Sequence, residues 1–96
     1  MAIEVKNTAQ AGKSPGWYQW TVFLEGPPEE LDRIKEVQYT LHPTFRNPVQ
    51  VVRERGSGGT GFALEGAGWG EFEIRLKTVR EDDEVETMEH WLDLST

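Results

Sequence analysis

The sequence predicts an all-β fold, an immunoglobulin-like antiparallel β-sandwich of about seven to eight strands. Three observations support this fold class. Apolar side chains recur at every second position in several segments, turn-forming residues separate those segments at short intervals, and helical spacing is confined to one brief stretch. A chain of 96 residues is long enough for one compact core, so residues 1–96 are expected to form a single domain.

The first half of the chain contains four expected strands, each supported by its own alternation. Residues 3–5 predict a short N-terminal strand. Residues 18–25 predict a longer one, because their even-numbered positions are apolar. Residues 37–42 carry apolar side chains at the odd-numbered positions, and residues 49–52 form a short valine-rich run after Pro48.

The second half contains three more expected strands. Residues 62–64 predict a weak one, and residues 71–79 predict the clearest strand of the chain, in which apolar residues alternate with charged ones. Residues 85–94 close the chain, with a candidate β-bulge near Met88.

Turn chemistry separates these strands. Pro27 and Pro28 cannot donate to a strand ladder, so they end the second strand. Residues 29–35 have helical spacing but are too short for a stable helix, which predicts a single turn or an irregular connection. Residues 55–61 are glycine-rich and predict a flexible hairpin tip or strand link, and residues 81–84 predict an acidic turn.

Composition excludes several classes of partner and environment. The net charge of −7 disfavours nucleic acid, whose phosphates require a basic face. No apolar run approaches the roughly 20 residues that span a bilayer, so no membrane association is expected. The sequence contains no cysteine and shows no export signal, which together predict an intracellular protein.

Candidate catalytic groups are sparse. His42 and His90 are the only histidines, and no spacing of metal ligands or of a nucleophile and its base accompanies them. Residues 56–61 match the pattern G-x-G-x-x-G, but no helix follows to supply a phosphate-binding N-terminus. We therefore expect no enzymatic activity, no metal and no cofactor.

Two segments are harder to explain as scaffold. Residues 41–48 place His, Thr and the aromatic Phe45 at the end of a strand. Residues 66–72 place Trp69 between glycines, which permit positive φ and a close backbone approach. The two rings either face each other across a binding slot or plug the end of the core. The residues alone favour neither interpretation.

These segments carry a resemblance to the YEATS domain family that covers nearly the whole chain. Residues 20–26 are similar to its W-x-V-x-[VL]-x-G strand, and residues 41–45 to its LH-x-S-[FY] loop, with Thr44 in the usual Ser position. Residues 68–74 match its GWGEFEI segment, and residues 90–94 resemble its closing strand.

The resemblance implies a non-enzymatic domain that binds acylated lysine, of the acetyl or crotonyl type, in a slot between two aromatic rings. It assigns the rings to Phe45 and Trp69, the hydroxyl that bonds the amide to Thr44, and the support of that hydroxyl to His42. The Trp69 backbone N–H would hold the acyl oxygen. The remaining ligand-binding candidates are Gly68, Gly70 and Phe72, which would shape the slot, and Tyr18, which stands where the family usually has His.

The implied partner is an acylated-lysine peptide or protein, histone-like in a eukaryote, bound by a monomer. The glycine-rich residues 55–61, which replace a proline-containing stretch of the family, favour a prokaryotic or divergent member. A prokaryotic member would be cytoplasmic and a eukaryotic one nuclear. One alternative keeps the scaffold as a protein–protein interaction or signalling sensor module that binds no acyl-lysine. A weaker alternative is a small-molecule pocket at the same loops.

Overall fold

A computed structural model describes residues 3–94. Within this range the chain forms seven strands and one short helix. In order these are β1 (Glu4–Ala11), β2 (Tyr18–Glu25), α1 (Pro28–Leu31), β3 (Ile34–Thr40), β4 (Val49–Val52), β5 (Thr60–Gly68), β6 (Glu73–Arg80) and β7 (Val85–Trp91).

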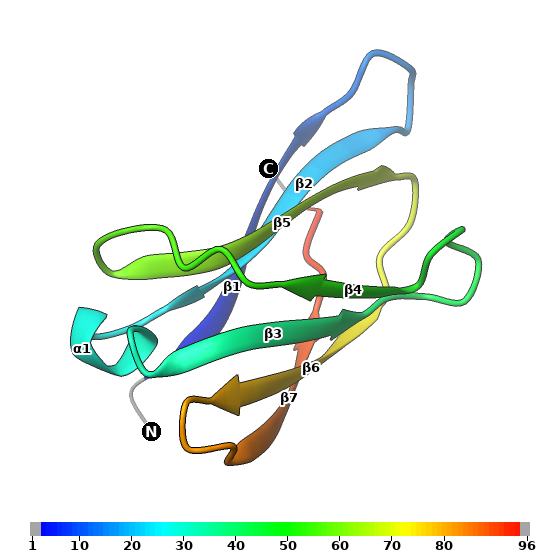
Figure 1. Cartoon of the computed structure of the whole chain (residues 1–96). Coiled ribbons are helices and arrows are strands. Elements are labelled where there is room, and N and C mark those ends of the chain that lie inside the picture. The colour runs from blue at the N-terminus through cyan, green and yellow to red at the C-terminus, as the bar shows by residue number, and fades with distance from the viewer. Residues whose placement is uncertain (1–2, 95–96) are drawn as a thin grey trace.

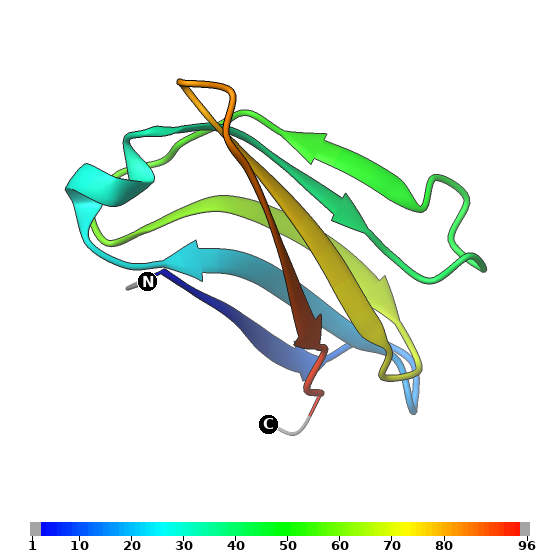
Figure 2. The same ribbon diagram turned by 90° about the horizontal axis from the view of Figure 1, so that it is seen from below.

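The strands form two sheets that pack face to face. One sheet has the strand order β1-β2-β5 and the other has the order β4-β3-β6-β7, and all pairings are antiparallel (Figure 1). Viewed after a quarter turn, the sheets lie as two twisted layers (Figure 2). The predicted immunoglobulin-like β-sandwich is thereby confirmed.

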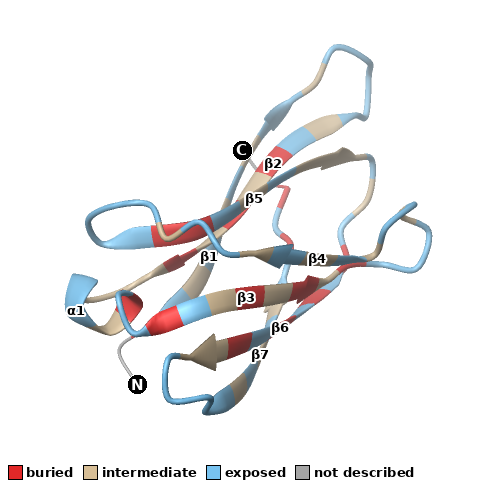
Figure 3. Ribbon diagram, in the orientation of Figure 1, coloured by how far each residue is buried: buried red, intermediate tan, exposed pale blue. Residues whose placement is uncertain are grey.

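The two sheets bury a core made of the inward-facing residues of the alternating pattern. The strands of Figure 3 accordingly show buried positions separated by more exposed ones. The buried apolar residues are Ile3, Trp20, Val22, Leu24, Leu31, Ile34, Val37, Tyr39, Leu41, Phe62, Phe72, Ile74, Leu76, Leu92 and Leu94. Burial of this apolar surface is the main force that holds the two sheets together.

Two strands are longer than the sequence predicted. β1 pairs with β2 along its full length, from Glu4 opposite Glu25 to Ala11 opposite Tyr18. β5 spans nine residues, although only residues 62–64 were expected. Both strands contain many small or polar residues, so backbone pairing to β2 defines them more than any apolar alternation does.

The bulge expected near Met88 is wrong, because β6 and β7 pair without a register shift from Glu73–Trp91 to Val79–Val85. The irregularities lie on β2, between Val22 and Leu24, and on β3. Opposite the β2 irregularity Phe62 has a φ of 54°, a left-handed conformation that is rare for a bulky residue. The Tyr39 hydroxyl donates a hydrogen bond to the Phe62 carbonyl, which satisfies that carbonyl inside the core.

The glycine-rich segment links β4 to β5 and thus crosses from one sheet to the other. The Arg55 guanidinium ties it down by donating to the carbonyls of Gly58 at 2.9 Å and Thr60 at 3.0 Å. The same group donates to the Asp32 carboxylate beside α1 at 2.8 Å. The segment is therefore an anchored crossover rather than a loose loop.

The connections β1–β2, β3–β4 and β5–β6 all lie at the end of the sandwich away from α1 (Figures 1 and 2). The β3–β4 connection contains residues 41–48, and the end of β5 together with the β5–β6 connection contains residues 66–72. The single helix among residues 3–94 is a four-residue turn, far from the length and apolarity that crossing a membrane requires.

Candidate functional site

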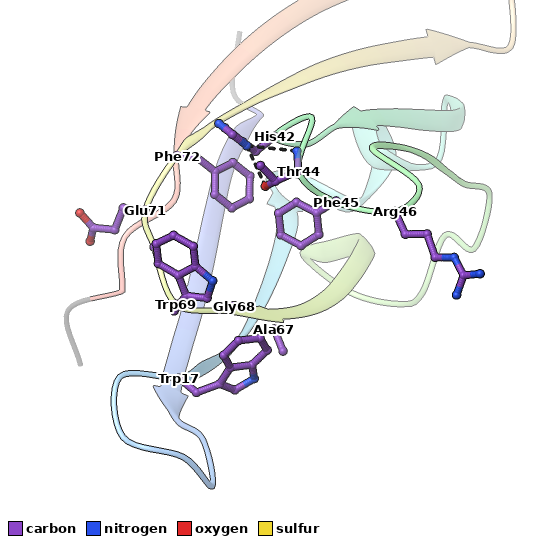
Figure 4. A pocket seen from close by; sticks show the side chains of 11 residues that line it. Trp17, His42, Thr44, Phe45, Arg46, Ala67, Gly68, Trp69, Glu71 and Phe72 are labelled. Atoms are coloured by element: carbon purple, nitrogen blue, oxygen red, sulfur yellow. Dashed lines mark hydrogen bonds between the residues drawn. The ribbon is translucent and has the colours of Figure 1, made fainter.

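A cavity of about 410 Å³ opens among these three connections (Figure 4). It draws residues from segments that are far apart in the sequence. Its lining consists of Trp17, His42, Thr44, Phe45, Arg46, Ala67, Gly68, Trp69, Gly70, Glu71 and Phe72. Seven of the eight candidates from the sequence are therefore brought together at one hollow, and Tyr18 is the exception.

One wall of the cavity is continuous with the core. The Phe45 and Phe72 rings pack at a tilt with their centroids 5.3 Å apart. Buried Trp20 meets both rings edge-on, at 6.3 Å from Phe45 and 6.2 Å from Phe72. Such edge-to-face contacts are favourable arrangements of aromatic rings, so the Phe45 ring is held in one orientation.

The opposite side of the cavity carries Trp69. Its side chain is 78% exposed, and no ring contact joins it to Phe45 among the described residues. Figure 4 shows the two rings on different sides of the cavity with space between them. Gly68 borders that space, since a Cβ there would lie 3.9 Å from Phe45 Cζ. The rings line an open slot and do not pack on each other.

The glycines that flank Trp69 differ from the sequence-based expectation in one respect. Neither Gly68 nor Gly70 has a positive φ. A Cβ on Gly70 would meet no atom within 4 Å. The backbone conformation of the free protein therefore does not demand glycine at residue 70, and the absence of a side chain leaves open space beside the Trp69 backbone.

His42 and Thr44 form a local hydrogen-bonded pair in the β3–β4 connection. Nδ1 of His42 lies 2.8 Å from Thr44 Oγ1 and accepts from the Thr44 backbone N–H at 3.2 Å. The loop that carries the pair is closed by backbone bonds. Leu41 N–H donates to the Pro48 carbonyl at 2.6 Å, and Phe45 N–H donates to the His42 carbonyl at 3.0 Å. The His42 ring also meets Phe72 edge-on at 6.1 Å.

Trp17 is a lining residue that the sequence analysis missed. It ends the β1–β2 connection, and a Cβ on Gly12 would come within 2.9 Å of its Cδ1 atom. Trp17 N–H donates to the Ser14 carbonyl at 3.0 Å, and its own carbonyl accepts from Gly12 N–H at 2.6 Å. These contacts fix Trp17 at the mouth of the cavity. Tyr18 instead begins β2 and packs partly against the core.

Two signals in the sequence point to Trp17. An aromatic residue follows a run of glycine, serine and proline, where no strand would bury it. It also lies one position before the alternating strand, so the alternation gives it no inward or outward assignment.

The charged residues of the lining turn away from the slot. Figure 4 shows the Arg46 guanidinium and the Glu71 carboxylate both directed outward. Glu71 Oε2 accepts from Leu94 N–H at 2.9 Å, and Oε1 accepts from the Trp91 indole N–H at 3.3 Å. Residues 3–94 contain no grouping of three or more side chains suited to hold a metal ion. The slot is thus largely apolar, and its polar groups include the Thr44 hydroxyl, the His42 imidazole and backbone groups.

Comparison with known proteins identifies the family. The sequence model of the prokaryotic YEATS domain matches residues 18–93, which is more than half of the chain. The chain belongs to the YEATS domain family. The resemblance on residues 20–26, 41–45 and 68–74 is thereby confirmed.

Curated relatives of this YEATS domain include the AF-9 homologue of Eremothecium gossypii, 41% identical over 73 residues. The match covers 74% of this chain and 33% of that protein. Subunit 14 of transcription initiation factor TFIID from Schizosaccharomyces pombe is 32% identical over 63 residues, covering 60% of this chain and 24% of that protein. This YEATS domain spans about a third or less of the length of these relatives.

Solved structures of related sequences have the same fold as this YEATS domain. A Yaf9 YEATS domain described as recognising an H3K122suc peptide superimposes with a TM-score of 0.77 at 33% identity, covering 96% of this chain and 70% of that one. The crystal structure of the yeast AF-9 homologue Yaf9 gives a TM-score of 0.77 at 33% identity, covering 98% of this chain and 67% of that one. The shared fold therefore includes nearly all of this YEATS domain.

Proposed function

We propose that this YEATS domain is a non-enzymatic module that binds acylated lysine in the slot between Phe45 and Trp69. The observation that carries the proposal is the open slot itself. One aromatic wall is fixed by the core, the other ring is largely exposed, and the two are not in contact. A flat group inserted between them would gain dispersion and π contacts with both rings.

The polar groups of the slot suit an amide. Acylation converts the lysine ammonium into a neutral planar amide with one donor and one acceptor. Both Thr44 and Trp69 line the cavity, and we assign the acceptor for the amide N–H to the Thr44 hydroxyl and the donor to the acyl oxygen to the backbone N–H of Trp69. Pairing both groups is required, because a buried polar group without a hydrogen bond costs free energy.

The same slot disfavours unmodified lysine. Glu71 is the only carboxylate of the lining, and both of its oxygens are engaged by the C-terminal segment. An ammonium in the slot would lose its hydration without gaining an ion pair. Discrimination between the two forms of lysine then follows from desolvation.

The acyl class that we propose is the short or flat one, acetyl to crotonyl. Trp17 stands at the mouth as a further wall, and the cavity of about 410 Å³ has room for more than an acetyl group. Because the Yaf9 structure is described with a succinylated H3 peptide, succinyl-lysine belongs in the same comparison. The partner would be an acylated-lysine peptide or protein, a histone in a eukaryotic nucleus or another protein in a prokaryotic cytoplasm.

A direct binding screen tests the proposal. Isothermal titration of peptides that differ only in acetyl-, butyryl-, crotonyl-, succinyl- or unmodified lysine should show measurable affinity for at least one acylated form. Unmodified peptide should bind at least about tenfold more weakly, as expected for an uncompensated buried charge. Equal affinity for acylated and unmodified peptides would overturn the proposal. No binding to any peptide would favour the interaction or sensor module.

A further inference from the structure

The segment that carries Trp69 is joined to the C-terminal end of the described chain by three hydrogen bonds. The Glu71 carboxylate accepts two of them, one from the Trp91 indole N–H and one from the Leu94 backbone N–H. The third runs from Leu92 N–H to the Phe72 carbonyl at 2.9 Å. Leu92 is fully buried and Leu94 is 7% exposed, so the C-terminal end of these contacts is anchored in the core.

At the opposite end of these contacts, residues 69–71 lie between β5 and β6 and outside the strand ladders. Trp69 lies between two glycines, and glycine has the largest conformational freedom of any residue. Its side chain is 78% exposed and makes no ring contact among the described residues. The strand β6 begins only at Glu73, so residues 69–71 lie outside its ladder, whereas Phe72 is held by its bond to Leu92 and by its burial in the core. Order in this segment must come from its attachment points.

We infer that Glu71 is a positioning residue for the ligand slot, acting by tying the Trp69 segment to the C-terminal segment 91–94. Its carboxylate points away from the cavity, as Figure 4 shows, so it acts through the backbone and not by touching the ligand. A carboxylate that accepts two hydrogen bonds on adjacent oxygens fixes both its own position and that of its neighbours. The inference rests on the proposed function of the same slot and assigns part of its affinity to residues about twenty positions away in the sequence.

Order at residues 91–94 and ligand binding at Trp69 are reciprocally coupled. If order in residues 91–94 favours the binding-competent position of Trp69, then ligand bound at Trp69 must favour order in residues 91–94 by the same factor. The Leu94 amide reports on this coupling, because its hydrogen exchange requires the bond to Glu71 to open.

The test compares Glu71→Ala with Glu73→Ala. Glu73 is the next outward-facing glutamate, and its side chain contacts Arg75 at 3.5 Å but does not line the cavity. With the acylated peptide that binds best, Glu71→Ala should weaken binding about tenfold. A loss of this size is expected if only about a tenth of the variant molecules keep Trp69 in its binding-competent position. The loss should appear in the association rate with the dissociation rate unchanged, since contacts in the complex remain. Glu73→Ala should bind like wild type.

A second variant and a second measurement keep the test decisive. Trp91→Phe removes the indole donor to Glu71 and retains an aromatic ring, so it should reproduce part of the loss if Glu71→Ala does not fold. In wild type, saturating peptide should slow exchange of the Leu94 amide, and Glu71→Gln, which keeps one acceptor oxygen, should recover most of the affinity. Peptide affinity unchanged in folded Glu71→Ala or Trp91→Phe would overturn the inference and leave the proposed function intact.

The ligand-free protein separates failure of the inference from failure of the proposed function. If wild type binds no acylated peptide, the proposed function fails. Backbone order parameters of Trp69 and Gly70 then still test the tie, because Glu71→Ala should lower them and Glu73→Ala should not. Unchanged order parameters in Glu71→Ala would show that Glu71 does not position this segment.

Discussion

The imidazole of His42 holds the Thr44 hydroxyl from one side, with Nδ1 and Oγ1 2.8 Å apart. Nδ1 also accepts the Thr44 backbone N–H at 3.2 Å, so this nitrogen carries no proton. The hydroxyl must then donate its own hydrogen to Nδ1. The lone pairs of Oγ1 remain available to accept a hydrogen bond from a donor such as the N–H of an acyl amide.

Replacing the Thr44 hydroxyl tests this role. Thr44→Val keeps the side-chain volume nearly constant and leaves the amide N–H of a bound acyl-lysine unpaired. Affinity for the acylated peptide should fall by about 1–3 kcal/mol, the cost of an unsatisfied buried donor. Thr44→Ser keeps the hydroxyl and should retain most of the binding. Calorimetric titration of each variant measures the change.

Stability must be measured on the same proteins. Thr87→Val, on the exposed outer surface of β7, controls for removing a surface hydroxyl and should leave affinity unchanged. His42→Ala should cost less affinity than Thr44→Val, since it removes only the group that orients the hydroxyl. A lower melting temperature of Thr44→Val with full affinity would show that the threonine only closes a turn.

Truncating either slot ring should weaken binding, but the two substitutions should differ in their effect on the stability of the fold. Trp69→Ala should weaken acyl-lysine binding by roughly 1–3 kcal/mol, as for a central aromatic anchor. Because Trp69 is 78% exposed, its loss should change the free energy of unfolding by less than about 0.5 kcal/mol. Phe45→Ala should lower affinity similarly and also destabilise the fold, since the ring packs on Trp20 and Phe72.

Trp91→Ala is the matched control for Trp69→Ala in these titrations. Its indole is 57% exposed and lies outside the cavity. A general loss of surface aromatic area would lower affinity in both variants equally. A smaller loss in Trp91→Ala, limited to its contribution through Glu71, is the expected result.

The alternation of apolar residues made the sandwich predictable. Strands without that alternation were predicted poorly. β2 and β6 have large apolar residues at every second position, so their inner faces were evident. β5 places Gly66 opposite Trp20 in the ladder, and a glycine contributes nothing to an apolar pattern. The requirement for a glycine there arises from a ring on a neighbouring strand, which a single-chain pattern cannot contain.

The site was predictable only where its residues fall in a motif. His42, Thr44, Phe45 and Trp69 follow from the two loop segments and were placed at one cavity. Trp17 belongs to a third loop whose position depends on the hairpin between β1 and β2. The bonds from Glu71 to residues 91 and 94 are tertiary contacts between segments about twenty residues apart, and no local spacing predicts them.

A glycine comparison tests how the core supports the slot. In Gly66→Ala the new Cβ would lie 2.4 Å from Cζ2 of Trp20, inside the core contact that also holds Phe45. Overpacking of this kind should lower the free energy of unfolding by about 1–3 kcal/mol. In Gly70→Ala the Cβ meets nothing within 4 Å, so stability should stay within about 0.5 kcal/mol of wild type. Urea denaturation measures both variants, and equal stability of the two would contradict the packing assigned to Trp20.

The other histidine predicts a pH dependence of stability. Nε2 of His90 lies 2.7 Å from Oδ1 of Asn7, and that oxygen also accepts the Asp93 backbone N–H at 3.1 Å. Since an amide oxygen only accepts, Nε2 carries the proton. Burial lowers the pKa of His90 below its ordinary value of 6.5, and this outweighs the attraction of the Asp93 carboxylate, which raises it.

The sign of the effect follows from proton linkage. With the folded-state pKa of His90 below 6.5, the unfolded chain binds a proton that the folded chain resists. The contribution of His90 to stability is therefore fully present above pH 6.5 and is lost as the pH falls through 6.5 toward the folded-state pKa. The pKa of Asp83 is lowered from its ordinary value of 3.8 by Lys35 and therefore lies below this window. Free energies of unfolding measured from about pH 7.5 to about pH 5 should decline more steeply for wild type than for His90→Gln. Parallel pH profiles of the two proteins would show that the contact between β1 and β7 does not depend on the neutral imidazole.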